Sequence, residues 1–225
     1  MTPDGRPDPD PGQWADPRPT YDLVATRYAD TFIDELSHKP FDRDLLDRFA
    51  AAVTGRSTVE VPVCDLGCGP GHIGAYLAGH QLPVTGIDLS PAMVAEAGRR
   101  FQGLSFRPGD MTALPVDHSS YSAIVTFYAI IHMPRPVVPN ALAEMHRALI
   151  EGDELLLAAH EGAGTLHADV MLEQPVSLDA TLFALDELVE LVEGAGFAIR
   201  EAHQRAPYEE EQPTERLYVW AVRRP

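Results

Sequence analysis

The sequence predicts an α/β fold in which helices cover both faces of an open, mostly parallel sheet. Short apolar runs alternate with amphipathic stretches along most of the chain, as strands and helices do in doubly wound proteins. Glycines at alternate positions follow the first apolar run, which is typical of a tight turn from a strand into a helix. Only a short polar segment, Gln204 to Arg216, separates the last two predicted strands, so we expect these two to pair antiparallel.

Residues 1–19 are predicted to be a disordered tail. They hold six prolines and four aspartates and have little apolar surface to bury, with Trp14 as the one possible anchor. Residues 20–225 are predicted to form one domain, with a helical cap over 20–55 and an α/β core over 56–225.

Two amphipathic helices are expected in the cap. The first has an apolar residue at every fourth position, at Val24, Tyr28, Phe32 and Leu36. Pro40 then interrupts the chain, and a second helix follows and ends before Gly55. Because a bare doubly wound domain lacks such helices, we expect them to cover the open top of the sheet.

Seven short segments of the core have the composition of strands. They are Val59 to Val63, Pro83 to Ile87, Leu104 to Phe106, Ser122 to Phe127, Glu154 to Ala159, Phe197 to Ile199 and Leu217 to Val222. Helices are expected between them, over Ile73 to Leu77, Pro91 to Ala97, Leu142 to Leu149 and Leu185 to Val192. Ser90 is predicted to cap the second of these helices, and the third is expected to end near Gly152.

Composition limits the classes of partner. The chain has 225 residues and a formal net charge of −17, a field that repels phosphate backbones and anionic membrane surfaces. We therefore expect a small-molecule partner, with neither nucleic acid nor membrane. The two cysteines, Cys64 and Cys68, are too few for a zinc site and too far apart along a strand for a disulfide. With no signal-peptide pattern and no long apolar run, a cytoplasmic location is expected.

The glycine turn is predicted to hold a nucleotide-like cofactor. Glycines let the backbone approach a ligand closely, and the helix that follows offers free N–H groups. The frame Gly69-x-Gly71-x-x-Gly74 satisfies the dinucleotide fingerprint, so a nicotinamide-dependent oxidoreductase is one alternative. The frame Asp65-x-Gly67-x-Gly69-x-Gly71 fits better, since its leading carboxylate can pair with a cationic amino-acid head.

This second frame resembles motif I of the class I S-adenosylmethionine-dependent methyltransferases of the small-molecule type. The resemblance runs from about Tyr21 to the C-terminus, and it implies a Rossmann-like sheet of seven strands whose last strand is antiparallel. It also implies S-adenosyl-L-methionine as the cofactor and S-adenosyl-L-homocysteine as the product. Tyr121-Ser122 and Glu151-Gly152-Asp153 depart from the family pattern at positions that do not contact the cofactor in the expected arrangement.

The resemblance assigns roles around the cofactor. Asp88, at the tip of the second strand, is expected to accept both ribose hydroxyls, which a nicotinamide cofactor would also allow. Asp110 is expected to accept from the adenine amino group, while Met111 and Met93 pack on the adenine ring. The cofactor-binding residues implied in this way are Tyr21, Tyr28, Asp65, Gly67, Cys68, Gly69, Asp88, Leu89, Met93, Asp110, Met111 and Phe127.

Candidate catalytic residues follow the fourth strand. His132 titrates near neutral pH and is a candidate base or substrate-orienting residue, although a histidine packed in a turn explains it equally well. Tyr128 is the second candidate. His160, Glu161 and His167 follow the fifth strand in a glycine-rich segment, which is expected to be a solvated loop and alternatively the wall of a substrate pocket.

The predicted activity is methyl transfer from S-adenosylmethionine to an O, N or C nucleophile of a metabolite or natural product. The protein would contribute mainly alignment and exclusion of water, since the sulfonium is already reactive. A catalytically silent methyltransferase-like binding protein is the alternative that fits the fold equally well. The sequence has no motif that identifies the methyl acceptor.

Overall fold

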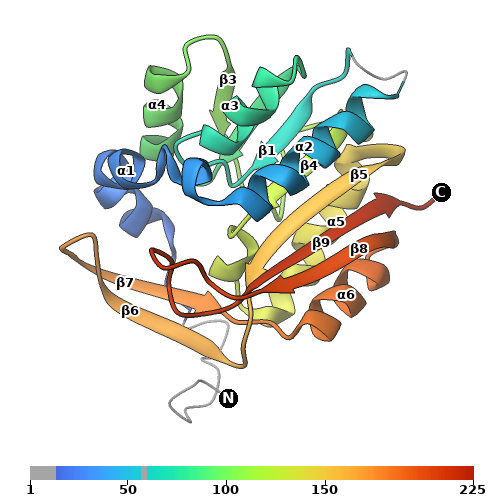
Figure 1. The fold of residues 1–225 in the computed structure, drawn as a ribbon. Helices are drawn as coiled ribbons and strands as arrows, with labels where there is room; N and C mark the ends of the chain where they lie inside the picture. The colour runs from blue at the N-terminus through green and yellow to red at the C-terminus, as the bar shows by residue number, and fades with distance from the viewer. Residues whose placement is uncertain (1–13, 57–59) are drawn as a thin grey trace.

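The computed structural model describes residues 14–56 and 60–225 of the chain. Within these residues, one seven-stranded sheet has the order β3-β2-β1-β4-β5-β9-β8, and a separate hairpin pairs β6 with β7 (Figure 1). The strands of the main sheet are β1 (Val63–Leu66), β2 (Val84–Asp88), β3 (Ser105–Pro108), β4 (Tyr121–Phe127), β5 (Leu149–His160), β8 (Phe197–Arg205) and β9 (Arg216–Arg223). β1 to β5 pair in parallel, whereas β9 runs antiparallel to both β5 and β8. The predicted fold class is therefore confirmed.

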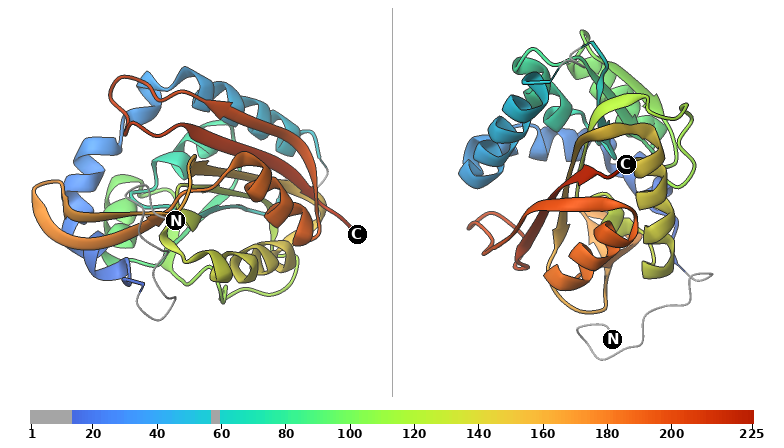
Figure 2. Two further views of the ribbon diagram at one scale, coloured as in Figure 1. Left: turned by 90° about the horizontal axis from the view of Figure 1, so that it is seen from below. Right: turned by 90° about the vertical axis from the view of Figure 1, so that its right-hand side faces the viewer.

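Helices cover both faces of this sheet. The α-helices are α1 (Arg18–Phe32), α2 (Pro40–Thr54), α3 (His72–Gly79), α4 (Pro91–Arg100), α5 (Val138–Ala148) and α6 (Leu185–Gly194). α2 and α3 pack on one face, and α5 and α6 pack on the other. Two views at right angles show the helices on either side of the strands (Figure 2).

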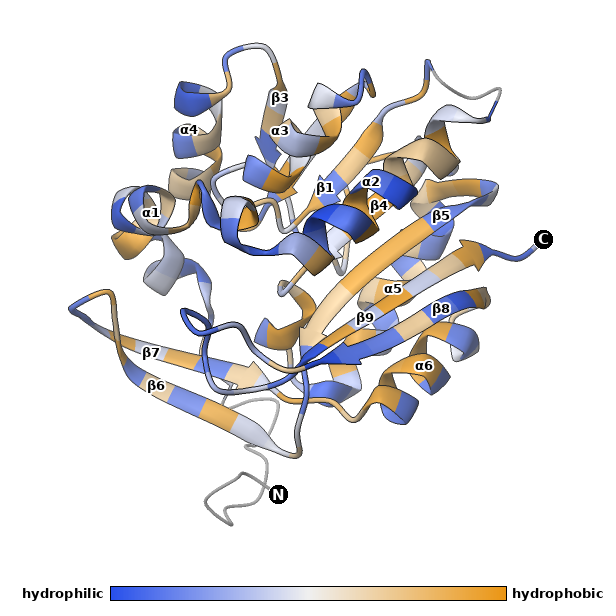
Figure 3. Ribbon diagram, viewed as in Figure 1, coloured by the Kyte–Doolittle hydropathy of each residue, from blue (hydrophilic) through white to orange (hydrophobic). Residues whose placement is uncertain are grey.

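Side chains along β5 point alternately to the two faces of the sheet, so this strand contributes to the hydrophobic core on each face. Leu155 and Leu157 point to the α5/α6 side, while Leu156 and Ala158 point to the α2/α3 side, and all four are fully buried. The hydrophobic colouring of β5 and β9 in Figure 3 reflects this burial on both faces.

The N-terminal helices have different positions. α1 lies against α4 and the hairpin strand β7, at the end of the sheet where the parallel strands finish, whereas α2 is part of a core layer. Between them, the short 3-10 helix η2 (Glu35–His38) contributes the buried Leu36. The predicted tail needs correction at its end: α1 begins at Arg18, and the Trp14 indole donates to the carbonyl of His132 at 3.1 Å. The rest of the predicted tail, residues 1–13, lies outside the described residues.

Several predicted boundaries were wrong. The first strand was expected at Val59 to Val63. Val59 lies outside the described residues, and β1 is Val63–Leu66, so Asp65 lies inside the strand. The helix expected to reach Gly152 ends at Ala148, because Leu149 already belongs to the long strand β5. β8 continues to Arg205, beyond its expected end at Ile199.

The hairpin of β6 (Thr165–Met171) and β7 (Gln174–Thr181) replaces the expected solvated loop. It projects from the main sheet beside α1, and η3 (Ile130–His132), which follows β4, also contacts β7. The hairpin therefore forms a wall next to the carboxyl ends of the parallel strands. In the part of the chain that the structure describes, no helix has the length and apolar character needed to span a membrane.

Candidate active site

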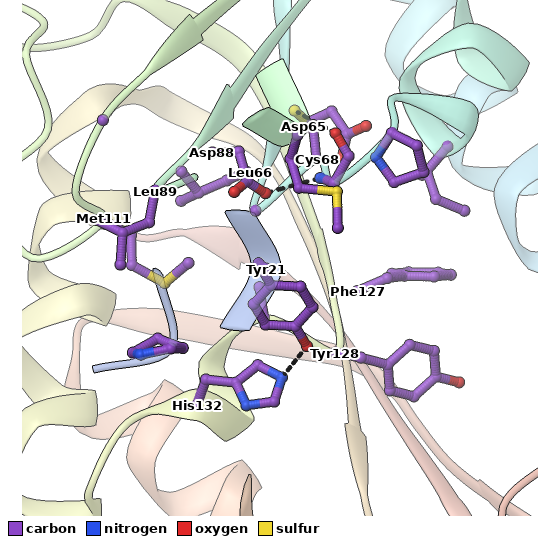
Figure 4. A pocket seen from close by; sticks show the side chains of 18 of the residues that line it. Tyr21, Asp65, Leu66, Cys68, Asp88, Leu89, Met111, Phe127, Tyr128 and His132 are labelled. Atoms are coloured by element: carbon purple, nitrogen blue, oxygen red, sulfur yellow. Dashed lines mark hydrogen bonds between the residues drawn. The ribbon is translucent and has the colours of Figure 1, made fainter. Parts of the chain in front are cut away.

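A cavity of about 310 Å³ lies where β1, β2 and β4 end, bounded on one side by α1. Every residue predicted from the sequence to bind the cofactor or to act in catalysis lines this cavity. Figure 4 labels several of them, including Asp65, Asp88 and His132. The carboxyl edge of a parallel sheet is where open α/β folds place their ligands, so this cavity is the candidate active site.

The glycine turn forms the floor of the cavity. Gly67, Gly69 and Gly71 have φ angles of +71°, +50° and +85°, a region that favours glycine. The N–H groups of Gly67 and Cys68 both donate to the carbonyl of Ile87, at 2.7 and 3.1 Å. A Cβ on Gly67 would lie 2.2 Å from the Cβ of Ala129, so this backbone passes too close to the loop after β4 for any side chain.

Asp65 is buried below the turn. Its Oδ2 accepts from the N–H of Gly74 at 2.8 Å, and only 2% of the residue is exposed. Burial raises the pKa of Asp65 to about 7, although His72 and the Gly74 N–H favour the charged form. Near neutral pH the carboxyl group therefore exchanges between its neutral and charged states, and a cation in the cavity would stabilise the charged one.

Asp88 is held by the backbone on both sides. Its Oδ2 accepts from Gly69 N and its Oδ1 from Ser90 N, each at 2.8 Å. Each carboxylate oxygen has a second lone pair, so the group can still accept two hydroxyls from a ligand. As predicted, Ser90 caps α4 by accepting from the N–H of Met93 at 3.1 Å.

Asp110 and Met111 lie at the far end of the cavity, after β3. Asp110 is exposed, and its Oδ1 accepts from both the N–H and the hydroxyl of Thr112, at 2.8 and 2.7 Å. Oδ2 makes no such bond within the turn. Leu89 and the buried Met93 line the same cavity, so this end combines one carboxylate with apolar side chains.

His132 and Tyr21 meet across the cavity. The Tyr21 hydroxyl lies 2.6 Å from His132 Nε2, and His132 Nδ1 lies 3.0 Å from the carbonyl oxygen of Asp179 on β7 (Figure 4). Burial lowers the pKa of His132, which Asp179 partly offsets. The side chain of His132 is thus a neutral imidazole at neutral pH, with both ring nitrogens in hydrogen bonds.

Tyr128 is oriented differently from His132. Its hydroxyl lies 3.1 Å from that of Tyr218, which in turn donates to Asp42 at 2.8 Å. Its ring stacks on His160, with the two centroids 5.0 Å apart. Tyr128 therefore faces the cavity with its ring and backbone, while its hydroxyl belongs to a buried polar network behind it.

His160 and His167 do not lie in a solvated loop. His160 ends β5, and its Nδ1 lies 2.9 Å from the Thr214 hydroxyl. His167 lies on β6, where its Nδ1 is 2.7 Å from Asp179 Oδ1. Glu161 follows β5 and forms a single bridge with Phe183. The expectation for this segment was wrong because several buried positions of the hairpin are polar, Thr165, Asp179 and Thr181 among them, so that its strands show little hydrophobic alternation.

Sequence reasoning missed Glu35 and His72, which also line the cavity. Glu35 Oε1 is 2.8 Å from His72 Nε2, and Glu35 Oε2 is 2.7 Å from Lys39 Nζ. Among the described residues, the buried His72 Nδ1 has no hydrogen-bond partner. His72 could have been suspected from its place directly after Gly71, but Glu35 lies in a turn without any motif.

The cavity has a pronounced charge bias. Its described lining includes the carboxyl groups of Glu35, Asp65, Asp88 and Asp110 and no lysine or arginine. Such a lining favours ligands that carry positive charge.

Comparison with known proteins gives similarity to methyltransferases at several levels. Residues 63–152 match the family model described as a methyltransferase domain. A demethylmenaquinone methyltransferase of Beutenbergia cavernae is 34% identical over 141 residues, which are 61% of this chain and 55% of that protein. The chain thus spans about half the length of this relative.

Solved structures share the fold at low sequence identity. One is a glycopeptide N-methyltransferase, MtfA, complexed with S-adenosyl-L-methionine, with a TM-score of 0.61 and 16% sequence identity. The match covers 79% of this chain and 93% of the MtfA chain. Another is the [4+2]-cyclase SpnF, with a TM-score of 0.67 and 16% sequence identity. That match covers 98% of this chain and 99% of the SpnF chain.

The close approach at Gly67 yields a stability prediction. Gly67→Ala adds a Cβ at a positive φ and against Ala129, so we expect it to lower the free energy of unfolding by about 1–3 kcal/mol. Gly79→Ala is the matched control, because its Cβ would meet nothing within 4 Å; its free energy of unfolding should stay within about 1 kcal/mol of wild type. Urea unfolding measures both, and equal losses would contradict the prediction.

His160 should make stability sensitive to acid. Burial, with Arg216 and His132 adding to it, lowers the pKa of His160 to about 3, against about 6.5 in an unfolded chain. Between these values only the unfolded state binds the proton, so stability falls as the pH is lowered from about 6.5, by at most about 1.4 kcal/mol per pH unit. We expect His160→Gln to reduce this slope in urea unfolding at pH 4.5 to 6.5. Identical slopes for variant and wild type would refute the prediction.

Proposed function

We propose that this chain, whose residues 63–152 match the family model described as a methyltransferase domain, is a class I S-adenosylmethionine-dependent methyltransferase that methylates an O, N or C nucleophile of a small molecule. The observation that carries the proposal is the cavity, where three carboxyl groups lie at the carboxyl ends of the parallel strands β1, β2 and β3, around a glycine turn. We assign the activity to a single domain over residues 20–225, in which α1 covers the cavity while α2 belongs to a core layer rather than to the expected cap over 20–55. The two free, buried cysteines support a reducing, cytoplasmic location.

The residues present fit S-adenosylmethionine. Asp88 has lone pairs left for the ribose hydroxyls, and Asp110 Oδ2 suits the adenine amino group. Asp65 and the Gly67 to Gly69 turn would receive the amino-acid head. The unpartnered His72 Nδ1, buried beside this end of the cavity, is a polar atom that a ligand could satisfy. Leu89, Met93, Met111 and Phe127 provide apolar contacts, and Tyr21 and Tyr28 cover the cavity from α1.

The cofactor, when bound, supplies a methyl group on a reactive sulfonium centre. The protein's residues then have three tasks: to align the acceptor, to exclude water and to accept a proton where the nucleophile must lose one. Tyr21 and His132 are both half-buried, and the neutral imidazole of His132 lies within the cavity, where it can help to accept this proton.

The charge of the cavity narrows the class of acceptor. With carboxyl groups and no lysine or arginine in its described lining, the cavity disfavours acceptors that are multiply anionic. An uncharged or cationic small molecule fits better, because an anion would find no fixed cation to pair with.

Two other functions remain as alternatives. A nicotinamide-dependent oxidoreductase would use the Gly69-x-Gly71-x-x-Gly74 frame and would leave Asp65 and Asp110 without a role. A binding protein without turnover would keep the same cavity. A cyclase shares this fold, as SpnF does, so fold alone does not assign the reaction.

Cofactor binding is tested first by calorimetric titration with S-adenosylhomocysteine, with NAD titrated in parallel. We expect micromolar affinity for S-adenosylhomocysteine alone, and a loss of at least about tenfold in Asp88→Ala, since a carboxylate hydrogen bond contributes about 1.5–3 kcal/mol. The exposed Asp117→Ala is the matched control for total charge and should bind as wild type does. Binding of NAD instead would refute the proposal.

Asp65 should make this affinity depend on pH. Because the pKa of Asp65 is about 7, its carboxyl group is mostly protonated and neutral at pH 6 and mostly ionised at pH 8. Because the ligand's ammonium group favours the charged form, affinity for S-adenosylhomocysteine should rise up to about tenfold from pH 6 to pH 8. Asp65→Asn should bind more weakly and largely lose this rise. The same rise in both proteins would show that another group is responsible.

A further inference from the structure

The contact between Tyr21 and His132 has a defined direction. His132 Nδ1 lies 3.0 Å from a backbone carbonyl oxygen, that of Asp179, and a carbonyl can only accept. Nδ1 must therefore carry the hydrogen. In a neutral imidazole this leaves Nε2 as a lone pair, so the Tyr21 hydroxyl, 2.6 Å away, donates to it.

This direction decides which atom an acceptor can meet. The one lone pair of Nε2 is already occupied by the Tyr21 hydroxyl, which covers it on the α1 side of the cavity. The Tyr21 oxygen keeps lone pairs of its own, and Tyr21 lines the cavity together with His132. A hydroxyl bound in the cavity can therefore donate to Tyr21 while Tyr21 donates to His132.

We propose that Tyr21 receives the proton of the methyl acceptor and passes its own proton to His132, and that the acceptor is a hydroxyl compound such as a phenol or an enol. This inference rests on the proposed function and names the substrate class for it. An acceptor that has a free lone pair and no proton to lose, such as a carboxylate or a tertiary amine, would not need the Tyr21–His132 pair as a base.

The step balances without any further reactant. The acceptor's O–H bond breaks and its proton binds to the Tyr21 oxygen, as the original Tyr21 proton moves to His132 Nε2. The acceptor oxygen forms its new bond to the methyl carbon, whose bond to the sulfonium sulfur breaks and leaves the electron pair on a neutral thioether. His132 then carries one extra proton, which it returns to solvent.

Neither residue can do this alone. Burial raises the pKa of the Tyr21 phenol well above its usual value, so Tyr21 stays protonated and is no base by itself. His132 is the base, but only through Tyr21.

Strand β7 positions both members of the pair. The Thr20 hydroxyl donates to Ser177 O at 3.3 Å, which ties α1 to β7 next to Tyr21. The Thr181 hydroxyl donates to Met133 O at 2.6 Å, which ties the chain after η3 to the same strand. The carbonyls of Ser177 and Asp179 are two residues apart and point to the same edge of β7, which therefore holds both the helix of Tyr21 and the ring of His132, while the Thr181 side chain holds the turn that follows.

The side chain of Asp179 is itself fixed. Its Oδ1 is 2.7 Å from His167 Nδ1, and its Oδ2 accepts from Ala15 N at 3.1 Å. The hairpin is therefore a positioning element for the proton-accepting pair.

The tautomer is tested without turnover. In the full-length protein, labelled with 15N-histidine and saturated with S-adenosylhomocysteine, we expect His132 to be neutral at pH 7 with the proton on Nδ1. Tyr21→Phe should shift the Nε2 resonance toward that of an unbonded nitrogen, and Thr20→Val should shift it in the same direction by less. The matched control Tyr76→Phe, on α3 away from the cavity, should leave it unchanged. A proton on Nε2, or an imidazolium at pH 7, would overturn the inference.

Turnover tests the role and the substrate class. With S-adenosylmethionine carrying a labelled methyl group, we expect product from phenol or catechol and none from aniline or benzoate. Tyr21→Phe and His132→Gln should each lower kcat at least about 100-fold, with the double variant no worse than either. KM for the cofactor and the affinity for S-adenosylhomocysteine should stay within about twofold. Methylation confined to the amine or the acid, or a Tyr21→Phe variant as fast as wild type, would overturn the inference. If S-adenosylhomocysteine does not bind at all, the proposed function itself fails.

Discussion

The candidate site depends on hydrogen bonds that backbone amides of the glycine turn and of α3 donate to acceptors on β1 and β2. Gly67 and Cys68 donate to a carbonyl of β2, Gly69 donates to Asp88, and Gly74 donates to Asp65. Each of these bonds crosses from the segment after β1 to an acceptor at the end of a strand. The turn is thus fixed before any ligand arrives, and the two carboxylates are oriented by the same bonds that hold the turn. A site built in this way loses little entropy when it binds.

Much of the fold was predictable from the sequence, since local chemistry specifies it. The glycine turn, the Ser90 cap and the reversed last strand all follow from residues close together in the chain. The end of β1 was misplaced because a buried aspartate, Asp65, occupies a strand position that the hydrophobic pattern does not predict. β6 and β7 were missed for a similar reason: polar residues such as Asp179 and Thr181 occupy buried positions of the hairpin, so the hydrophobic pattern shows no strand period.

All the site residues predicted from the sequence line the cavity, but the contacts among them were not predicted. Tyr21 and His132 lie 111 positions apart, and nothing in either segment shows that they meet. Glu35 and His72 were missed for the same reason. Tyr128 illustrates the converse, because a residue in the right segment directs its hydroxyl away from the cavity. Periodicity and motifs place side chains at an edge of the sheet, whereas hydrogen-bond direction depends on tertiary packing.

The ties from β7 to both α1 and η3 have a consequence for how the molecule assembles. Most of the cofactor half of the cavity is drawn from one stretch, residues 65 to 112, and its key bonds span at most 21 positions, as from Asp88 to Gly109. The other half joins Ala15 to Asp179 and Trp14 to His132, contacts separated by 164 and 118 positions. Since contacts between distant segments form slowly, the nucleotide cradle should become ordered early on the folding pathway and the proton-accepting pair late. A chain arrested between these stages would bind the cofactor as the native protein does but would lack the proton-accepting pair and hence the methyl-transfer activity.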